Sequence, residues 1–220
     1  MTGYTRSPKV QKGAIVGLDK FNPLASVIIF QYNPEKLTRS LVAQTAGGDA
    51  ASGEALRFKA PPRETITLDA EIDAADQLEQ DDALATTIGL HATLASLEML
   101  LYPKSAAVIA NEVLKAVGVI EVIPPEAPLT LLIWSVKRVL PVRLKTFSIT
   151  EEAFDPNLNP IQAKVSLSMD VLTYDDLGIL SVGGALFMAH QISKEVMATI
   201  GGVSSIAGEI SSSVNLSTGT

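Results

Sequence analysis

The residues that could do acid–base or metal chemistry are few and lie far apart in the chain. The two histidines, His91 and His190, are about a hundred residues apart, and neither belongs to a metal-ligand pattern such as H-x-x-x-H. The sequence has no phosphate-binding loop, no nucleophile elbow and no G-x-G-x-x-G. The pairs Gly183-Gly184 and Gly201-Gly202 lie in a small-residue segment and indicate helix breaks. We therefore predict no catalytic, cofactor or metal site, and a protein that is not an enzyme.

Acidic residues gather in one segment, which raises the possibility of calcium binding. They are Asp69, Glu71, Asp73, Asp76, Glu79, Asp81 and Asp82. The segment lacks the glycine and the terminal glutamate of a Ca²⁺-binding loop, so a solvated edge is the better interpretation. Such an edge could meet a basic patch on a neighbouring subunit. The basic counterpart within this chain is Lys137, Arg138, Arg143 and Lys145.

Composition indicates a globular protein with a mostly aliphatic core. The chain has 220 residues, of which 47% are hydrophobic, 19% charged and only 5% aromatic. A net charge of −7 argues against nucleic acid as the main partner. The sequence contains no cysteine, which excludes disulfides and thiolate metal sites. Residues 1–12 are polar and are not followed by an apolar stretch, so we expect no signal peptide and maturation in the cytoplasm.

The N-terminal third is predicted to contain short strands. We expect strands at Ala14–Leu18 and Val27–Gln31, with a turn around Asn22-Pro23 between them. The second strand ends at Tyr32-Asn33-Pro34, because proline fixes its own φ and pushes the preceding residue into extended geometry. A polar segment and then an exposed loop from Ala43 to Glu54 follow.

Residues 65–72 alternate cleanly between apolar and polar side chains. Ile66, Leu68, Ala70 and Ile72 face one side, which predicts a half-buried strand after a stop at Pro61-Pro62.

Two helices are expected in the middle of the chain. Asp82 can cap a helix that runs to Leu101 and ends at Tyr102-Pro103. Two apolar stripes indicate that it lies deep against a sheet, one with Leu84, Ile88, His91 and Ala95, the other with Leu90, Leu94, Leu97 and Leu101. Ser105 to Val117 has the spacing of a second, shorter helix, and a rigid connector begins at Pro124-Pro125.

Three further strands are expected in sequence, as an antiparallel meander. They are Thr130–Leu140, Val142–Thr150 after Pro141, and Lys164–Leu172. The alternation of the middle strand slips between Leu144 and Phe147, as a β-bulge would cause. A turn at residues 155–160 separates the last two strands.

The C-terminal segment changes character. Residues 177–210 are rich in Gly, Ala, Ser and Ile, and read as one or two helices. The uncharged stretch of 13 residues from Leu177 to Ala189 is shorter than the ~20 needed for a membrane span. A stripe of Ile192, Val196, Met197 and Ile200 favours a helix that docks on an adjacent subunit, although it could also pack on its own domain. Residues 211–220 are expected to be a disordered tail.

Two phrases of the sequence resemble the tube-type domain of contractile injection systems, the phage-tail-like particles with an inner tube, baseplate and spike. F-Q-Y-N-P-E-K-L-T-R-S at residues 30–40 is similar to the opening of that domain. I-T-E-E-A-F-D-P-N-L-N-P-I-Q-A at residues 149–163 is similar to its closing meander, in a quite specific pattern. The resemblance covers roughly residues 14–175 and is greatest to the baseplate adaptors between inner tube and spike hub. Such adaptors commonly end in a peptidoglycan-binding LysM module, but nothing after Tyr174 offers its strand–helix–helix–strand pattern.

The resemblance implies a mainly β, α+β fold: a split β-barrel of two antiparallel sheets with a packed helix. The expected organisation is an arm at residues 1–13, the barrel at 14–175, a helical extension at 176–210 and a tail at 211–220. The implied role is a structural ring, a homohexamer, that connects the inner tube to the spike and to other baseplate subunits. The particle would be assembled in a bacterial cytoplasm and could act outside the cell.

We expect the subunit interface to include the turn after the second strand and the charged residues of later strands. The predicted interface residues are Tyr32, Asn33, Pro34, Glu35, Lys36, Arg39, Asp69, Glu71, Lys137, Arg138, Arg143 and Lys145. Two other functions remain open. One is an inner tube or tube-initiator subunit of the same particle. The other is a cell-envelope binding module that acts through the C-terminal segment.

Overall fold

The computed structural model describes residues 11–18, 27–45, 57–79, 82–118 and 127–217. Seven strands form one hydrogen-bonded sheet in the order β2-β1-β5-β6-β7-β4-β3, and every neighbouring pair is antiparallel. They are β1 (Ala14–Leu18), β2 (Val27–Ile29), β3 (Leu37–Thr45), β4 (Phe58–Asp73), β5 (Leu129–Ser135), β6 (Arg138–Phe154) and β7 (Pro160–Val171). The mainly β, α+β class with an antiparallel meander β5-β6-β7 is confirmed.

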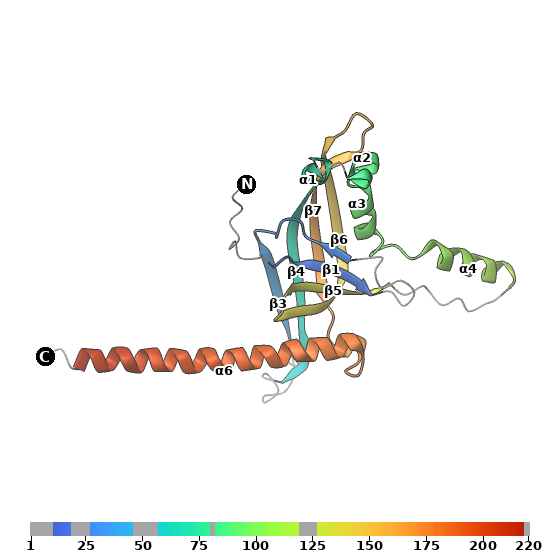
Figure 1. Ribbon diagram of the computed structural model, residues 1–220. Helices are drawn as coiled ribbons and strands as arrows, with labels where there is room; N and C mark the ends of the chain where they lie inside the picture. Colours follow the sequence, from blue (N-terminus) through green and yellow to red (C-terminus); the bar gives the residue numbers. More distant parts are fainter. Residues whose placement is uncertain (1–10, 19–26, 46–56, 80–81, 119–126, 218–220) are drawn as a thin grey trace.

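The strands belong to one continuous sheet, where two sheets were expected. The long strand β6 joins the two halves, because residues 138–142 pair with β5 and residues 142–154 pair with β7. Figure 1 shows β1 and β5 lying across the long strands β4, β6 and β7. The sheet thus folds over its own apolar face, as in a split barrel.

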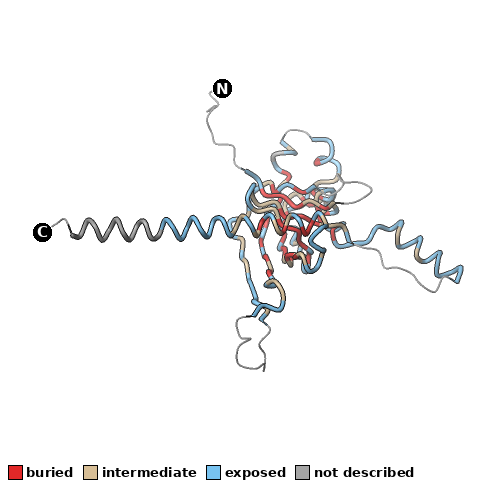
Figure 2. Tube along the Cα trace, turned by 90° about the horizontal axis from the view of Figure 1, so that it is seen from below, coloured by how far each residue is buried: buried red, intermediate tan, exposed pale blue. Residues whose placement is uncertain are grey.

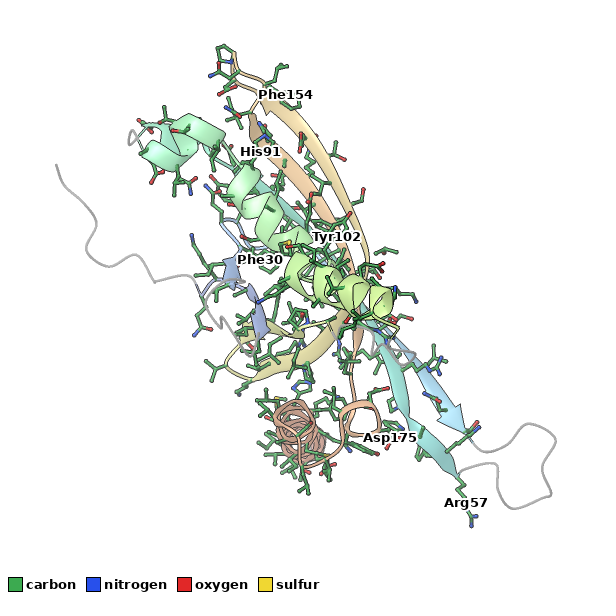
Figure 3. The ribbon with its side chains drawn as sticks, turned by 90° about the vertical axis from the view of Figure 1, so that its right-hand side faces the viewer. Phe30, Arg57, His91, Tyr102, Phe154 and Asp175 are labelled. Atoms are coloured by element: carbon green, nitrogen blue, oxygen red, sulfur yellow. The ribbon has the colours of Figure 1, made fainter. Side chains whose placement is uncertain are left out.

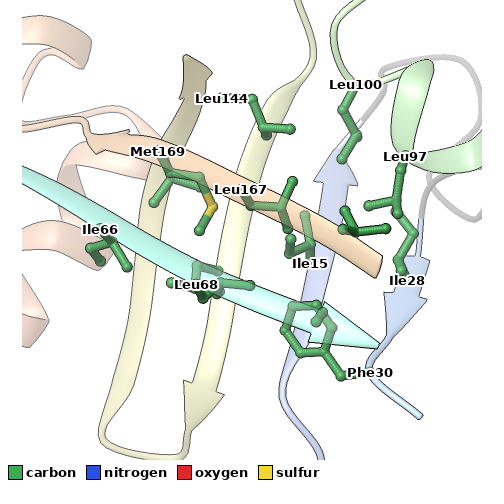
Figure 4. Packing of buried hydrophobic residues seen from close by; sticks show 14 of the residues in the cluster. Ile15, Ile28, Phe30, Ile66, Leu68, Leu97, Leu100, Leu144, Leu167 and Met169 are labelled. Carbon is green, nitrogen blue, oxygen red and sulfur yellow. The ribbon is translucent and has the colours of Figure 1, made fainter. Parts of the chain in front are cut away.

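Alternate side chains of both halves fill the space between them. Ile66 and Leu68 of β4, Leu167 and Met169 of β7 and Ile15 of β1 are buried in one cluster (Figure 4). The alternation predicted for residues 65–72 is therefore confirmed. Burial of each such side chain stabilises the fold by about 1.5–3 kcal/mol, so this aliphatic cluster holds the barrel together.

Three short helices follow β4, and two of them lie in the region where one long helix was predicted. The helices are α1 (Ala75–Glu79), α2 (Ala83–Ile88) and α3 (His91–Glu98). Asp82 caps α2 as predicted, since its Oδ1 accepts hydrogen bonds from the backbone N–H groups of Leu84 (2.9 Å) and Ala85 (3.1 Å). At Gly89 the chain adopts a positive φ of 55°, and a Cβ there would lie 2.5 Å from the carbonyl oxygen of Pro160. The helix therefore breaks at Gly89, and the prediction of one helix to Leu101 is wrong.

The break also changes which side chains reach the core. Leu90, Leu94 and Leu97 are buried, together with Leu100, whereas Leu101 is exposed. The other predicted apolar stripe is not buried, because Leu84, His91 and Ala95 are exposed and Ile88 is half-buried. The expectation of a helix with a wide buried surface is therefore wrong.

Three prolines that were expected to lie outside strands, at two places in the chain, lie inside them instead. Pro61-Pro62 falls in the part of β4 that pairs only with β3, next to register shifts after Val42, and an irregular edge tolerates residues without an N–H. β6 runs through Pro141, and the break comes earlier, at Val136-Lys137. The β-bulge is confirmed, since the register with β7 shifts between Leu144 and Thr146.

The turn between β6 and β7 forms as predicted. Asp155 accepts hydrogen bonds from the backbone N–H groups of Asn157 (2.7 Å) and Asn159 (2.8 Å). These hydrogen bonds hold the pKa of Asp155 below its usual value, and the bond from the backbone of Asn159 has the largest effect.

Three further helices complete the chain: α4 (Ser105–Ala116), α5 (Tyr174–Leu177) and α6 (Val182–Ser217). The short helix expected at residues 105–117 is confirmed as α4. Figures 1 and 2 show α4 and α6 projecting from opposite sides of the barrel, with most of their described length exposed. α6 is one helix of 36 residues, about 54 Å long. It continues through residues 211–217, which were expected to belong to a disordered tail.

Some predictions fall outside the described residues. They are the arm at residues 1–10, the turn at Asn22-Pro23, the part of the predicted loop at 46–54, the position of Asp81, the connector at Pro124-Pro125 and the tail at 218–220. The start of that loop was predicted wrongly, because residues 43–45 belong to β3.

Candidate functional site

The turn at Asn33 ties the start of β1 to the end of β2. The Oδ1 of Asn33 accepts a hydrogen bond from the N–H of Gly13 (2.9 Å), and its Nδ2 donates to the carbonyl of Gln11 (2.7 Å). The backbone N–H of Phe30 donates to the carbonyl of Gly13, and a Cβ on Gly13 would lie 2.9 Å from the Phe30 ring. Asn33 is thus bound within its own subunit, whereas Tyr32 is half exposed.

The polar segment after this turn, for which no secondary structure was predicted, becomes the strand β3. β3 pairs only with β4 among the described residues, so its other edge is free. The strand could not be predicted from sequence, because neither face of β3 is fully buried and its residues therefore do not alternate between apolar and polar. Of the predicted interface residues, Glu35 and Lys36 precede this edge strand and Arg39 lies on it.

A second free edge lies on the other side of the long strands. Beyond Val142, β6 pairs only with β7 within the part of the chain that the structure describes. Residues 145–154 thus present unpaired backbone groups, as β3 does. Figure 1 shows β3 and β6 on opposite sides of the set β3-β4-β7-β6. Sequence reasoning missed this edge, because strand partners are set by the three-dimensional arrangement.

The face of this four-stranded section that points away from the core is polar. Four rows cross it in register, and each row takes residues from neighbouring strands. The rows are Ser40, Thr65, Asp170 and Arg143; Thr38, Thr67, Ser168 and Thr146; Asp69, Ser166 and Ser148; and Glu71, Lys164 and Thr150. The Oγ of Ser166 donates to Asp69 (2.6 Å), and the Oγ1 of Thr65 donates to Asp170 (2.9 Å).

The four basic residues expected to form one patch lie in two places. Arg143 and Lys145 lie on or beside the polar face, each 3.9 Å from a carboxylate oxygen of Asp170. Lys137 and Arg138 lie at the turn between β5 and β6, next to α6. Residues 139–142 of β6 separate the two pairs, so the four residues do not form one patch, and their part in a subunit contact stays a prediction.

An ion pair lies on the core side near the free edge of β3. Arg39 of β3 donates to the carboxylate of Glu64 of β4, and Glu64 is only 5% exposed. The hydrogen bond to Glu64, together with its charge, raises the pKa of Arg39. Arg39 thus has a partner within its own subunit.

The root of α6 is firmly attached to the barrel. Thr173 and Asp176 form a reciprocal cap at α5, and the rings of Tyr174 and Phe187 pack edge to face with centroids 5.9 Å apart. Gly184 lets the helix approach the preceding turn, since a Cβ there would lie 2.1 Å from the carbonyl oxygen of Gly178. Both glycine pairs that were expected to break helices, Gly183-Gly184 and Gly201-Gly202, lie inside the continuous helix α6, so this prediction is wrong.

His190 lies on the face of α6 that packs against the turn between β5 and β6, and it is 7% exposed. Its Nδ1 is 3.1 Å from the carbonyl oxygen of Lys137, so Nδ1 carries the proton and donates it to that oxygen. Its Nε2 is buried without a hydrogen-bond partner among the described residues. Burial lowers the pKa of this imidazole, because a charged ring there would lose its hydration.

Beyond their roots, α4 and α6 expose apolar side chains. On α4 these include Ile109, Val113 and Val117 at its end; on α6 they include Ile192, Val196, Ile200 and Val203. The junction before α6 also exposes Ile179, Leu180 and Val182, and Leu180 is 98% exposed. Contiguous exposed apolar side chains of this kind mark binding surfaces.

The described residues offer little chemistry. They contain no group of three or more His, Asp or Glu side chains placed to hold a metal ion. A hollow of about 350 Å³ between β2, β4 and α3 has mainly aliphatic walls, with Lys12, Gln31, Gln77 and Thr93 as its polar side chains. No described helix is long and apolar enough to cross a membrane.

Comparison with known proteins gives little further information. No protein-family model and no curated protein matches this sequence. Among solved structures, one similar chain comes from the tail of an empty GTA particle with C6 symmetry. It shares 10% sequence identity, the alignment covers 62% of this chain and 74% of that chain, and the TM-score is 0.25. A likeness of this degree carries no argument about fold or function.

Proposed function

We propose that this chain is a structural subunit of a contractile, phage-tail-like particle and that it forms a ring between the inner tube and the spike. The observation that carries the proposal is the four-stranded section β3-β4-β7-β6. Among the described residues it has a free edge on each side, along β3 and along β6 beyond Val142. The tube-type phrases at residues 30–40 and 149–163 support the same class of protein. The function is assembly, with no turnover.

The strand directions suit a ring of identical subunits. Each strand of the section is antiparallel to its neighbour, and four strands make an even number, so β3 and β6 run in opposite directions. A rotation about an axis along the strands would bring β6 of one copy beside β3 of the next as an antiparallel pair. Such head-to-tail contacts close into a ring, and closure pairs both free edges of the four-stranded section.

The polar face suits the wall of a channel. In such a ring the apolar core lies on one side of the continuous barrel, and the rows of Ser, Thr, Asp and Lys side chains lie on the other. Carboxylates and amines are mixed on this face and several are paired, as in Lys164 with Glu152 (2.8 Å). A hydrated wall of this kind would let a transported molecule slide past without adhering.

The predicted interface residues take different places in the proposed ring. Glu35, Lys36 and Arg39 belong to the β3 side of the ring contact, and Tyr32 is half exposed beside it. Asp69, Glu71, Arg143 and Lys145 belong to the channel face. Asn33 positions the turn, and Pro34 limits its geometry.

The test has two steps. Light scattering of the purified full chain should give a closed oligomer, and particles assembled without the chain should carry tubes that are not attached to the spike. A chain that stays a monomer at every concentration, with no density in a baseplate ring, contradicts the proposal. Density repeated along the tube would instead identify an inner tube subunit. Residues 177–220 would also be removed. If this deletion abolishes binding to cell envelopes and the particles still assemble, the chain is an envelope-binding module.

A further inference from the structure

The outer part of α6 has an apolar face that is exposed among the residues the structure describes. Ile192, Val196, Ile200 and Val203 follow each other at intervals of four, four and three residues, which places them on one side of the helix. Each is more than half exposed. Phe187, which packs on Tyr174, lies about half a turn away from this stripe. The stripe therefore faces away from the barrel to which the helix is attached.

A second apolar surface lies at the root of the same helix. Ile179, Leu180 and Val182 are exposed where α5 leads into α6. The chain reaches this point through a turn in which Gly178 has a φ of 77° and Ser181 donates from its N–H to the carbonyl of Gly178. The apolar side chains are thus held outward on an ordered turn.

The two surfaces lie on opposite sides of the subunit. Figure 1 shows that α6 starts near β6, crosses the lower ends of the long strands and extends beyond β3. In the ring proposed above, the β6 side of one copy meets the β3 side of the next. The outer helix of one copy would therefore cross the junction into the region where its neighbour presents the root of α6.

We propose that the α6 stripe of each subunit docks on the α6 root of the adjacent copy of this chain. This inference rests on the proposed ring and adds a helical strap to its strand contacts. The chemistry of the two surfaces agrees, since both are aliphatic and the stripe carries no charge. The contact continues the proposed β3–β6 interface, so both would form together.

The absence of cysteine from this sequence makes the contact easy to test. We would prepare L180C and V196C as single variants of the full chain, mix them, and oxidise them. Within one copy, residue 196 lies about 21 Å along the helix from Val182, too far from Leu180 for a disulfide, whose Cα atoms lie within about 7 Å. The expected result is a covalent dimer in the mixture that neither single variant forms to a similar extent.

The matched control is A198C, because Ala198 is also exposed but lies about half a turn from Val196. A mixture of A198C and L180C should give at least tenfold less dimer. Equal dimer from both mixtures, or a V196C dimer formed without L180C, overturns the strap and indicates random or helix-to-helix contact.

The experiment separates this inference from the proposed function. If the wild-type chain forms a closed oligomer and the mixture gives no dimer, the strap is wrong and the ring stands. If the wild-type chain is a monomer, the ring fails and the strap fails with it.

Discussion

The barrel and the projecting helices use the same aliphatic residues in opposite ways. In the barrel, Leu132 and Leu140 are fully buried between the halves of the sheet. On α6, Ile200 and Val203 are each 63% exposed, although the helix is well attached at its root. Figure 3 shows the long strands with Arg57 and Phe154 at opposite ends, and α6 end-on beside them. The contrast indicates that the apolar residues of the barrel stabilise the single subunit. The exposed apolar residues of α6 would be buried only in contact with a partner.

The largest expected effect is a difference in stability between two leucine-to-alanine substitutions, one in the barrel and one at the root of α6. Leu140→Ala should lower the free energy of unfolding by about 2–5 kcal/mol, because it leaves a cavity in the core. Leu180→Ala, at a side chain that is 98% exposed, should change it by less than about 0.5 kcal/mol. Urea unfolding at dilutions where the chain is dissociated measures both. Equal losses would refute the division between the two regions.

The ion pair beside β3 should give the next effect. Arg39→Ala leaves the buried carboxylate of Glu64 without its partner and should cost about 3 kcal/mol at pH 7. The double variant Arg39→Leu with Glu64→Leu should recover most of this loss, because no uncompensated charge remains. Denaturant titration of both variants is the check, and a harmless Arg39→Ala would show that the pair does not stabilise the fold.

Two glycines in α6 sharpen the comparison within one helix. Gly184→Ala should detach the root of α6, because the new Cβ would lie 2.1 Å from a backbone oxygen. Gly202→Ala meets nothing within 4 Å and should stabilise the outer helix by about 1 kcal/mol. Hydrogen exchange of α6 peptides in the dissociated chain distinguishes these results. Faster exchange in Gly202→Ala would contradict the exposed position of this residue.

The smallest effect is expected from acid. Because burial lowers the pKa of His190 in the folded chain, the unfolded state binds more protons as the pH falls below about 6.5. Attachment of α6 should therefore weaken from about pH 6.5 downward, until the folded pKa is passed. Lys194 and Arg138 also oppose a charge on this ring, whereas the hydrogen bond to Lys137 and the charge of Glu64 favour it.

The pH effect is measured by hydrogen exchange of residues 183–195 between pH 7 and pH 5. His190→Phe should flatten the dependence, and His91→Phe is the control because His91 is exposed. An unchanged slope in His190→Phe would assign the dependence to another group.

The sequence predicted what depends on local pattern. The alternation of β4, the Asp82 cap, the meander and the bulge after Leu144 are all visible as short-range signals. The helix break at Gly89 was missed because its cause, the carbonyl of Pro160, lies far along the chain. β3 was missed because none of its residues is fully buried, so its sequence shows no clear alternation. The free edges could not be predicted, since they follow from which strands pair.

The central claim is that β3 of one copy pairs with β6 of the next, and hydrogen exchange across assembly tests it most directly. Peptides covering residues 37–45 and 145–154 should become strongly protected in the oligomer, whereas β7, already paired on both sides, should change little. Protection that is the same in the assembled and dissociated chain at both edges would contradict the account.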